Sequence, residues 1–545
     1  MLDYKRKYIY NSTIKTVFNK FYKKYPNNIL LSNSVKLNEF SDKSYSFSEV
    51  KKHIDRNINF FKKNKFNIGD RVALIIGNNP EYFILKLSLN YFGLSCVPIN
   101  NELTIREIAF IIKNSNPRYI IYSNANKLLI KKLISVNPIK NVGLINFTLN
   151  HLELKTPSLK KYKKKIQKLS SKLESSILYT SGTTGNPKGC ILTHEYEINA
   201  GYSYAIKKGL ISFKIGKERL YNCLPVHHIN SGVFSFFAML MTGNCHIQAK
   251  RFSASEFWND IKQTKATIFH YLGVMVTILF KQNNNSAFNN NLRLGVGAGI
   301  EPSLHYKFEK KFKIPMIELW GMTEMVRCII DNSKKRIIGK RCFGEISYGL
   351  ESKVVDNKGM QIYNKPGLFF IRFNKKNPKL GFFNGYNKNK AATLDAWKKG
   401  WFNTGDIVIK DKSGKHYFVD REKNIIRRSG ENISSSEIEQ FLLDIKFINN
   451  CAVLSKKHEI YEEEVFALII IKKHIKKNII TGKKIIKELS KELAYFKLPC
   501  YIKFVDTLPL TSSQKIDRNK TKNLLLNYKN DHFFDLEKYK RSFKK

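Results

Sequence analysis

The stretch from Ile177 to His194 constrains the fold of this chain more than any other feature of its sequence. It opens with an apolar run that predicts a buried strand, and it then breaks into a segment of glycine, hydroxyl and lysine residues. The pair Ile191-Leu192 predicts a second strand, and Thr193-His194 has the character of a helix start. A loop of unusual composition is therefore expected between two strands.

This loop has the composition of a phosphate-binding segment. Glycines let the backbone approach a ligand and turn its N–H groups toward an anion, while hydroxyl groups and a lysine add donors and positive charge. The residues predicted to bind a polyphosphate are Thr180, Ser181, Gly182, Thr183, Thr184, Gly185 and Lys188. Pro187 and Gly189 stand where the common P-loop requires glycine and a hydroxyl residue, so the loop is of another kind. A plain surface turn is the simpler alternative, and the density of phosphate-binding residues disfavours it.

The stretch closely resembles the phosphate loop of the acyl-adenylate-forming superfamily, which includes acyl-CoA synthetases, luciferases and the adenylation domains of peptide synthetases. Further motifs follow in the family order along most of the chain. Leu292–Gly299 is similar to the segment that holds adenine in the family, which implies this role for Gly297, Ala298 and Gly299. A tight turn with no ligand is the alternative for this segment.

A second signature follows, because Ile317–Glu324 resembles the family's Tyr-Gly-Met-Thr-Glu string with a tryptophan as its aromatic residue. The residues that it assigns are Trp320, Gly321, Thr323 and Glu324. The aromatic ring can stack on adenine, the threonine hydroxyl can bind phosphate, and the carboxylate is a ligand that Mg²⁺ prefers beside phosphates. The resemblance implies catalytic roles for Thr323 and Glu324, and a metal held by Glu324 and Thr180.

Two motifs nearer the C-terminus carry further roles by resemblance. Trp401–Asp406 contains the family's Thr-Gly-Asp string, and the resemblance implies that the Asp406 carboxylate binds both ribose hydroxyls. In the similar hinge motif, Arg421 contacts ribose or phosphate, Lys423 lies at the hinge itself, and Gly430 lies on a loop that lines the pantetheine tunnel.

The last motif, Leu508–Arg518, resembles the C-terminal segment that supplies the family's catalytic lysine, here Lys515. Gln514 replaces the glycine that usually precedes this lysine, and a side chain there can alter the turn.

The paired histidines His227 and His228 follow an apolar strand end and Pro225, as expected for the wall of a cleft. A lone histidine is more often structural. The family places an aromatic residue or histidine followed by a histidine beside its acyl pocket, which implies that role for His228 and, less directly, for His227.

Composition excludes several other classes of protein. The net charge of +51 attracts anions, but the lysines are dispersed and no nucleic-acid-binding module is recognisable, so we expect no nucleic-acid partner. The eight cysteines form no CxxC pair, which is typical of reduced thiols. No signal peptide or membrane-length apolar run is visible, and a cytoplasmic protein without membrane insertion is expected.

Strand and helix patterns alternate through much of the chain, which predicts an α/β fold with largely parallel sheets. We predict a large N-terminal AMP-binding domain over residues 1–422 and a small mobile C-terminal α/β lid domain over residues 423–545. Residues 145–175 look like a lysine-rich connector, and the tail after residue 524 looks peripheral. The resemblance allows a homodimer.

The combined motifs imply an enzyme that uses ATP, Mg²⁺ and coenzyme A to convert a carboxylic acid into an acyl-adenylate and then an acyl-CoA thioester. The strings Leu224–Asn230, Phe418–Arg421 and Arg428–Ile433 look most like the crotonobetaine/carnitine–CoA ligase branch, which implies a small or medium, carnitine-like acid. A medium-chain fatty acid and a non-CoA acceptor remain alternatives. No aspartate lies between residues 224 and 258, which disfavours an α-amino acid, and a luciferase or a non-catalytic acyl-nucleotide binder is less expected.

Overall fold

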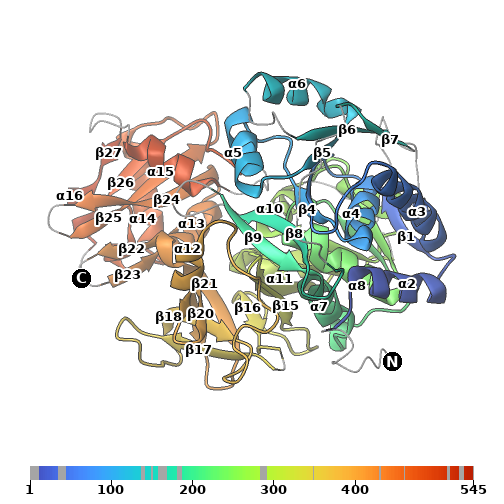
Figure 1. Cartoon of the computed structure of the whole chain (residues 1–545). Helices are drawn as coiled ribbons and strands as arrows, with labels where there is room; N and C mark the ends of the chain where they lie inside the picture. Colours follow the sequence, from blue (N-terminus) through green and yellow to red (C-terminus); the bar gives the residue numbers. More distant parts are fainter. Residues whose placement is uncertain are drawn as a thin grey trace. The chain divides into compact units, whose positions relative to one another are not determined.

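The computed structural model of the chain is drawn in Figure 1. It describes residues 11–34, 44–136, 142–148, 151–156, 168–180, 187–282, 291–347, 349–428, 431–458, 461–511, 516–526 and 533–543. The chain forms two compact units, of which unit 1 comprises Met1–Leu350 with Arg372–Gly400 and unit 2 comprises Glu351–Ile371 with Trp401–Lys545. The domain boundary that the sequence places after residue 422 was assigned from a hinge motif, and it stays a prediction.

Unit 1 contains a seven-stranded sheet in the order β7-β6-β5-β3-β4-β8-β9. Its strands are β3 (Arg71–Ile75), β4 (Ser95–Pro98), β5 (Tyr119–Ser123), β6 (Gly143–Thr148), β7 (His151–Leu154), β8 (Glu174–Thr180) and β9 (Lys188–Thr193). The central pairs are parallel, and the edge strands β7 and β9 run antiparallel to their neighbours.

The second sheet of unit 1 has eight strands in the order β15-β14-β13-β12-β10-β11-β1-β2. They are β1 (Ile29–Asn33), β2 (Ser44–Ser46), β10 (Arg219–Asn222), β11 (Cys245–Gln248), β12 (Ile268–Leu272), β13 (Leu294–Ala298), β14 (Met316–Met322) and β15 (Met325–Ile330). Pairing is parallel from β1 to β14 and antiparallel at both edges. The predicted, largely parallel α/β architecture is confirmed.

Several helices of unit 1 begin where the sequence supplies caps. The helices of this unit are α2 (Ile14–Lys24), α3 (Phe47–Lys63), α4 (Pro80–Phe92), α5 (Ile105–Ser115), α6 (Lys127–Ser135), α7 (His194–Ala205), α8 (Phe236–Thr242), α9 (Phe257–Gln263), α10 (Gly273–Lys281), α11 (Pro302–Phe312) and α12 (Lys390–Asp395). Asn79 accepts a hydrogen bond from Tyr82 N and precedes Pro80, as expected for the start of α4. Thr193 caps α7 in the same way, which confirms the predicted helix start.

A buried ion pair ties two of these helices to the strand that leads into the phosphate-loop segment. Lys86 of α4 donates to Glu197 of α7 over 2.9 Å, and both side chains are almost fully buried. Ser175 and Ser176 of β8 donate to the same carboxylate. A buried charge that loses its partner destabilises a fold by about 3–5 kcal/mol, so this cluster holds β8 firmly against α4 and α7.

Unit 2 contains a sheet in which β18 (Pro366–Arg372), β20 (Trp401–Lys410) and β21 (His416–Arg421) pair antiparallel, with β17 (Glu351–Val355) next to β18. A second sheet follows the order β23-β22-β25-β26-β27, with β24 also paired to β25. Its strands are β22 (Ile425–Arg428), β23 (Glu431–Ser434), β24 (Ile448–His458), β25 (Glu462–Ile471), β26 (Tyr501–Phe504) and β27 (Phe534–Asp535). The helices are α13 (Ser435–Asp444), α14 (Ile479–Leu489), α15 (Arg518–Leu526) and α16 (Glu537–Arg541).

Two predictions about connecting segments are wrong. The supposed connector over residues 145–175 contains most of the β6–β7 hairpin and the first two residues of β8, because its short apolar runs pair as strands at the sheet edge. The tail is not peripheral, since Leu536 packs in the hydrophobic core of unit 2 and β27 pairs with β26. Within the described part of the chain, no helix has both the length and the apolar character needed to cross a membrane.

Candidate active site

The β8–β9 hairpin places the two ends of the predicted phosphate loop opposite each other. Thr180 and Lys188 are paired in the antiparallel register, and the Thr180 hydroxyl donates to the Lys188 carbonyl over 3.4 Å. The predicted loop residues Ser181, Gly182, Thr183, Thr184 and Gly185 lie outside the described residues. The hairpin thus brings a hydroxyl and an ammonium group to the mouth of this segment.

Thr323 and Glu324 form the turn between β14 and β15, where Met322 pairs with Met325. The Tyr196 hydroxyl donates to the Thr323 carbonyl over 2.7 Å, which fixes the turn from helix α7. Glu324 is buried, and its carbonyl accepts a hydrogen bond from Phe383 N. Its carboxylate is therefore held on a short, doubly anchored turn.

Tyr386 connects Glu324 with the phosphate-loop hairpin. Its hydroxyl donates to Glu324 Oε1 over 2.6 Å, and the Lys188 ammonium lies 5.1 Å from the centre of its ring. Burial raises the pKa of Tyr386, and the Glu324 charge raises it further, so the phenol remains a donor at neutral pH. A lysine, a phenol and a carboxylate thus form one cluster within unit 1.

The backbone around Tyr386 explains how it reaches this place. Asn384 N donates to Ile191 O, and Ile191 N donates to Gly385 O, so residues 384–387 run beside β9. Cys190 forms an isolated bridge with Tyr386. Burial raises the pKa of the Cys190 thiol, as does Glu324, and the thiol remains protonated. Sequence reasoning missed Tyr386, because a Gly-Tyr-Asn string indicates only a turn.

The predicted adenine segment is the end of β13. A Cβ atom on Gly297 would lie 2.2 Å from the Tyr271 carbonyl, so no side chain fits there. Gly299 has φ +79°, a conformation that favours glycine, and the space beside it is open. Ala298 lies between them at the strand end. The surface of this segment therefore consists mainly of backbone, against which a flat ring can lie.

Glu318, which the sequence motifs did not single out, holds the turn that follows. Its carboxylate accepts hydrogen bonds from Gly299 N over 3.1 Å and from Ile300 N over 2.8 Å. Burial raises the pKa of Glu318 to about 7, although these two donors act in the opposite direction. The only sequence signal for Glu318 was its place in the motif, where it is the first residue of the Glu-Leu-Trp string.

We expect Glu318→Gln to change how stability depends on pH. The folded carboxyl has a pKa of about 7 against an ordinary value of 4.5, so the folded chain binds more protons than the unfolded chain between these values. Stability from this group therefore falls as pH rises through that window, whereas glutamine stays neutral. The melting temperature of the variant minus that of the parent should rise from about pH 5 to about pH 8. A constant difference across that range would contradict the assignment.

Trp320 and Gly321 lie in β14, just before the Thr323-Glu324 turn. The indole is almost fully buried and stacks on the Phe343 ring, with centroids 5.8 Å apart. One face of the predicted adenine-stacking ring is thus covered by another aromatic side chain.

The two predicted acyl-pocket histidines lie in the turn after β10. Their ring centroids are 4.5 Å apart, and His228 N donates to Pro225 O. Burial holds the pKa of His227 well below its ordinary value, and His228 lowers it further. His227 is therefore an uncharged ring at neutral pH. Gly232 lies close beneath this turn, because a Cβ on it would lie 2.1 Å from the Val226 carbonyl.

In unit 2, Asp406 and Arg421 are cross-strand partners on β20 and β21. Arg421 Nε lies 2.8 Å from Asp406 Oδ1, and the aspartate is fully buried whereas the arginine is partly exposed. The neighbouring Asp420 carboxylate accepts hydrogen bonds from Ser434 Oγ and Ser436 N. These bonds fix the backbone on both sides of the predicted hinge.

Lys423 belongs to a short 3-10 turn over Glu422–Asn424. Burial lowers the pKa of Lys423, and Arg421 and Arg518 lower it further. The predicted residues Gly430, Gln514 and Lys515 lie outside the described residues. Leu510 and Ile516, which flank the segment that contains Lys515 in the sequence, form an antiparallel bridge.

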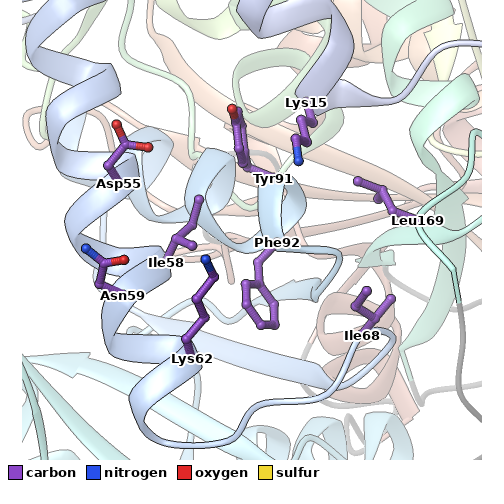
Figure 2. Close-up of a pocket in the computed structure, with 9 residues that line it drawn as sticks. All are labelled: Lys15, Asp55, Ile58, Asn59, Lys62, Ile68, Tyr91, Phe92 and Leu169. Carbon is purple, nitrogen blue, oxygen red and sulfur yellow. The ribbon is translucent and has the colours of Figure 1, made fainter.

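A cavity of about 530 Å³ in unit 1 has no predicted site residue in its lining. It lies among α2, α3 and α4 (Figure 2), where the Lys15 ammonium is 5.0 Å from the centre of the Tyr91 ring. Lys62 and Asp55 of α3 line it together with the apolar side chains of Ile58 and Phe92. We assign no ligand to this cavity.

A nucleotide-binding α/β enzyme is the class of protein that this fold and cluster define, and comparison with known families agrees. A family description of AMP-binding enzymes matches residues 18–375, which is more than half of the chain. The AMP-binding enzyme C-terminal domain matches residues 437–515. The chain belongs to the AMP-binding enzyme family, as its motifs predicted.

Individual relatives share the chain's length and fold. Crotonobetaine/carnitine–CoA ligase of Escherichia coli (strain K12 / DH10B) is 27% identical over 500 residues, covering 88% of this chain and 93% of the relative. That of Salmonella arizonae is 26% identical over 498 residues, with the same coverage. The anthranilate CoA ligase AuaEII with anthranoyl-AMP has a TM-score of 0.80 at 19% identity, covering 94% and 97% of the two chains. ATP-bound MatB from Rhodopseudomonas palustris has a TM-score of 0.78 at 20% identity, covering 95% of this chain and 99% of the MatB chain. The structures establish the fold, a large N-terminal domain and a smaller C-terminal one.

Proposed function

We propose that this protein is an ATP-dependent carboxylic acid–CoA ligase that forms an acyl-adenylate and then an acyl-CoA thioester. The observation that carries the proposal is the cluster of Lys188, Tyr386 and Glu324, which joins two motifs that lie far apart in the sequence. It combines a cation for phosphate with a fixed carboxylate for a metal ion. A protein that only bound acyl-nucleotides would need the cation for phosphate but not a carboxylate fixed for a metal ion.

In the first half-reaction, a carboxylate oxygen of the acid attacks the α-phosphorus of ATP, and pyrophosphate leaves. Negative charge increases on the phosphoryl oxygens, so positioned donors and cations supply most of the rate. Lys188, Thr180, Thr323 and the loop residues 181–185 would bind the phosphates. Bound Mg²⁺ would supply further positive charge to those oxygens.

The residues present fit a magnesium ion. Tyr386 donates to Glu324 Oε1 and so orients the carboxylate, whose oxygens would be ligands for the cation. Thr180 offers a hydroxyl oxygen at the mouth of the phosphate loop. Oxygen ligands of this kind, together with phosphates, are what Mg²⁺ prefers.

In the second half-reaction, the CoA thiolate attacks the acyl carbon, the bond to the phosphate oxygen breaks, and AMP leaves. Asp406 and Arg421 would bind the ribose and its phosphate, while Gly297, Ala298, Gly299 and Trp320 would hold adenine. Gly430 would lie where the pantetheine thiol enters. Lys423 would be the pivot for the rearrangement between the half-reactions, and Lys515 would serve only the first of them.

A small or medium carnitine-like acid is the substrate that we favour. The relatives named as crotonobetaine/carnitine–CoA ligases match along nearly their whole length and support this choice. An uncharged, half-buried His227 would not repel a quaternary ammonium group, and His228 would line the same pocket. A medium-chain fatty acid is the runner-up.

Acid-dependent AMP release tests this proposal. The purified protein is incubated with ATP, Mg²⁺, CoA and one acid at a time from a panel that includes crotonobetaine, carnitine and fatty acids of increasing length. AMP should form only when both CoA and a suitable acid are present, and most rapidly with a carnitine-like acid. Neither AMP nor pyrophosphate with any acid would refute the ligase function, whereas a preference for a fatty acid would refute only the substrate.

A further inference from the structure

Lysines are dispersed along the chain as a whole, but one surface of unit 2 concentrates them. Residues 472–487, which run from the end of β25 into helix α14, contain seven lysines and a histidine but no aspartate or glutamate. All seven lysines are exposed, and we call this surface the basic patch: Lys472, Lys473, Lys476, Lys477, Lys483, Lys484 and Lys487. Like charges held so close together repel one another, and an anionic partner would relieve that repulsion.

Few acidic groups of the chain balance the basic patch. Lys477 forms an ion pair with Asp506. Among the described residues, the ammonium groups of Lys472, Lys473 and Lys476 have no such partner. The patch therefore presents most of its positive charge to the solvent and to whatever binds there.

Helix α14 (Ile479–Leu489; Figure 1) turns one face to the core and its lysines to the solvent. The buried residues recur at helical spacing and are Gly482, Ile485, Ile486 and Leu489. Lys483, Lys484 and Lys487 follow Ile480 by three, four and seven positions, so they share its side of the helix. Core packing explains the buried face, but it does not explain Ile480, which is 71% exposed.

The start of α14 fixes its two exposed isoleucines among the lysines. Asn478 Oδ1 accepts a hydrogen bond from Thr481 N over 2.9 Å, and the Thr481 hydroxyl donates to Lys476 O over 2.7 Å. Ile479, which is 42% exposed, and Ile480 lie between the lysines that precede the helix and those on it. The basic patch is thus a preformed surface with apolar side chains among cations.

We propose that the basic patch binds the surface of an anionic lipid bilayer, with α14 lying flat against it. The ammonium groups would contact anionic headgroups, and Ile480 would enter the boundary between headgroups and acyl chains. Such surface binding needs no helix that spans the membrane. Nucleic acid offers the same negative charge but no apolar layer for Ile480, so a lipid surface fits the patch better. No residue predicted to bind a substrate belongs to the patch, so this inference goes beyond the ligase function.

Sedimentation with lipid vesicles tests this binding without any substrate. Vesicles of phosphatidylcholine alone are compared with vesicles of an equal mixture of phosphatidylcholine and phosphatidylserine, at low and at physiological salt. The parent protein should bind only the mixed vesicles, and more weakly as salt rises, because salt screens exposed charges. A parent that stays in solution with the mixed vesicles at low salt, or that binds both kinds equally, would overturn the inference.

The triple variant Lys473→Gln/Lys476→Gln/Lys487→Gln removes three charges from the patch. Its affinity for mixed vesicles should fall about 100-fold at low salt, because each lysine near an anionic surface contributes about fivefold. A control with the same net charge changes three exposed lysines of unit 1: Lys334→Gln/Lys335→Gln/Lys340→Gln. The control should stay within about twofold of the parent. Equal losses in the two variants would show attraction to net charge alone and would overturn the inference.

Ile480→Gln keeps every charge of the patch and tests the apolar contact. Its affinity for mixed vesicles should fall about tenfold, because an isoleucine gains that much by leaving water. Leu394→Gln in α12, where the leucine is 61% exposed, should bind as the parent does. If Ile480→Gln also binds as the parent does, the helix does not lie in the headgroup boundary and the inference fails.

An RNA oligonucleotide is the probe for the other class of polyanion. The parent should bind it more weakly than it binds mixed vesicles at the same salt. Tighter binding to RNA, lost in the patch triple variant and kept in Ile480→Gln, would assign the patch to nucleic acid and overturn the inference. Melting curves that match the parent's show that each variant is folded, as expected for exposed positions.

Discussion

Lys515→Ala is expected to slow adenylation by about 10²–10³-fold and to leave thioester formation from a supplied acyl-adenylate near the parent rate. A lysine ammonium on a flexible stem can neutralise the additional negative charge that the α-phosphate gains as it is attacked. That additional charge disappears once pyrophosphate has left. The bridge between Leu510 and Ile516 holds the ends of the segment that carries it. ATP–pyrophosphate exchange and single-turnover thioester formation measure the two steps separately.

Lys520 provides the matched control for this prediction. It is an exposed lysine of α15, only five positions further on, and its ammonium lies 3.8 Å from Asp517. Lys520→Ala should leave both steps unchanged. Gln514→Gly, which restores the residue usual in the family, should be neutral or mildly activating. Equal loss of both half-reactions in Lys515→Ala would argue against a role confined to adenylation.

Glu324→Gln should reduce pyrophosphate exchange by about 10²–10³-fold, mainly because the variant should bind Mg²⁺ more weakly. Glutamine keeps an oxygen that accepts the Tyr386 hydrogen bond, so the turn between β14 and β15 should stay intact. The loss of negative charge should therefore affect the metal and not the fold. Exchange is measured over a range of Mg²⁺ concentrations, with a melting curve beside it.

Tyr386→Phe separates orientation from charge at the same site. It removes the hydroxyl that donates to Glu324 but leaves the carboxylate, so a loss of about tenfold is expected. If Glu324→Gln loses no more activity than Tyr386→Phe, the carboxylate does not hold the metal.

Local sequence patterns predicted those elements whose signals are local. Thr193 begins a helix where the sequence predicted one. Asn79-Pro80 and the apolar runs around Leu74 and Val97 are local signals of the same kind, at which a helix begins and buried parallel strands form. Strand β1 was missed, because Ile29–Asn33 is a short run in a polar, basic region and becomes a strand only by pairing with β11. The β6–β7 hairpin was missed for the same reason.

The residues of the site also divide into those that local motifs identified and those that they did not. Motifs identified Glu324 and Lys188, but no local pattern links them to Tyr386, which is 62 residues from its partner Glu324. Glu318 binds the backbone of Gly299 and Ile300, and such a contact requires β13 and β14 to be neighbours. Outside the site, Lys540 contacts Glu464 across 76 residues in a tail whose composition suggested only a charged surface. Long-range pairing created each of these contacts.

One isotope measurement tests the central claim most directly. The protein is supplied with an acid whose carboxylate carries a heavy oxygen isotope, together with ATP, Mg²⁺ and CoA, and the nucleotide product is analysed by mass spectrometry. If the carboxylate attacks the α-phosphorus and the thiolate then displaces AMP, one labelled oxygen must remain on the AMP phosphate. Labelled AMP alongside acyl-CoA is the predicted result. Acyl-CoA formed with unlabelled AMP, or with ADP and labelled phosphate, would contradict the acyl-adenylate mechanism.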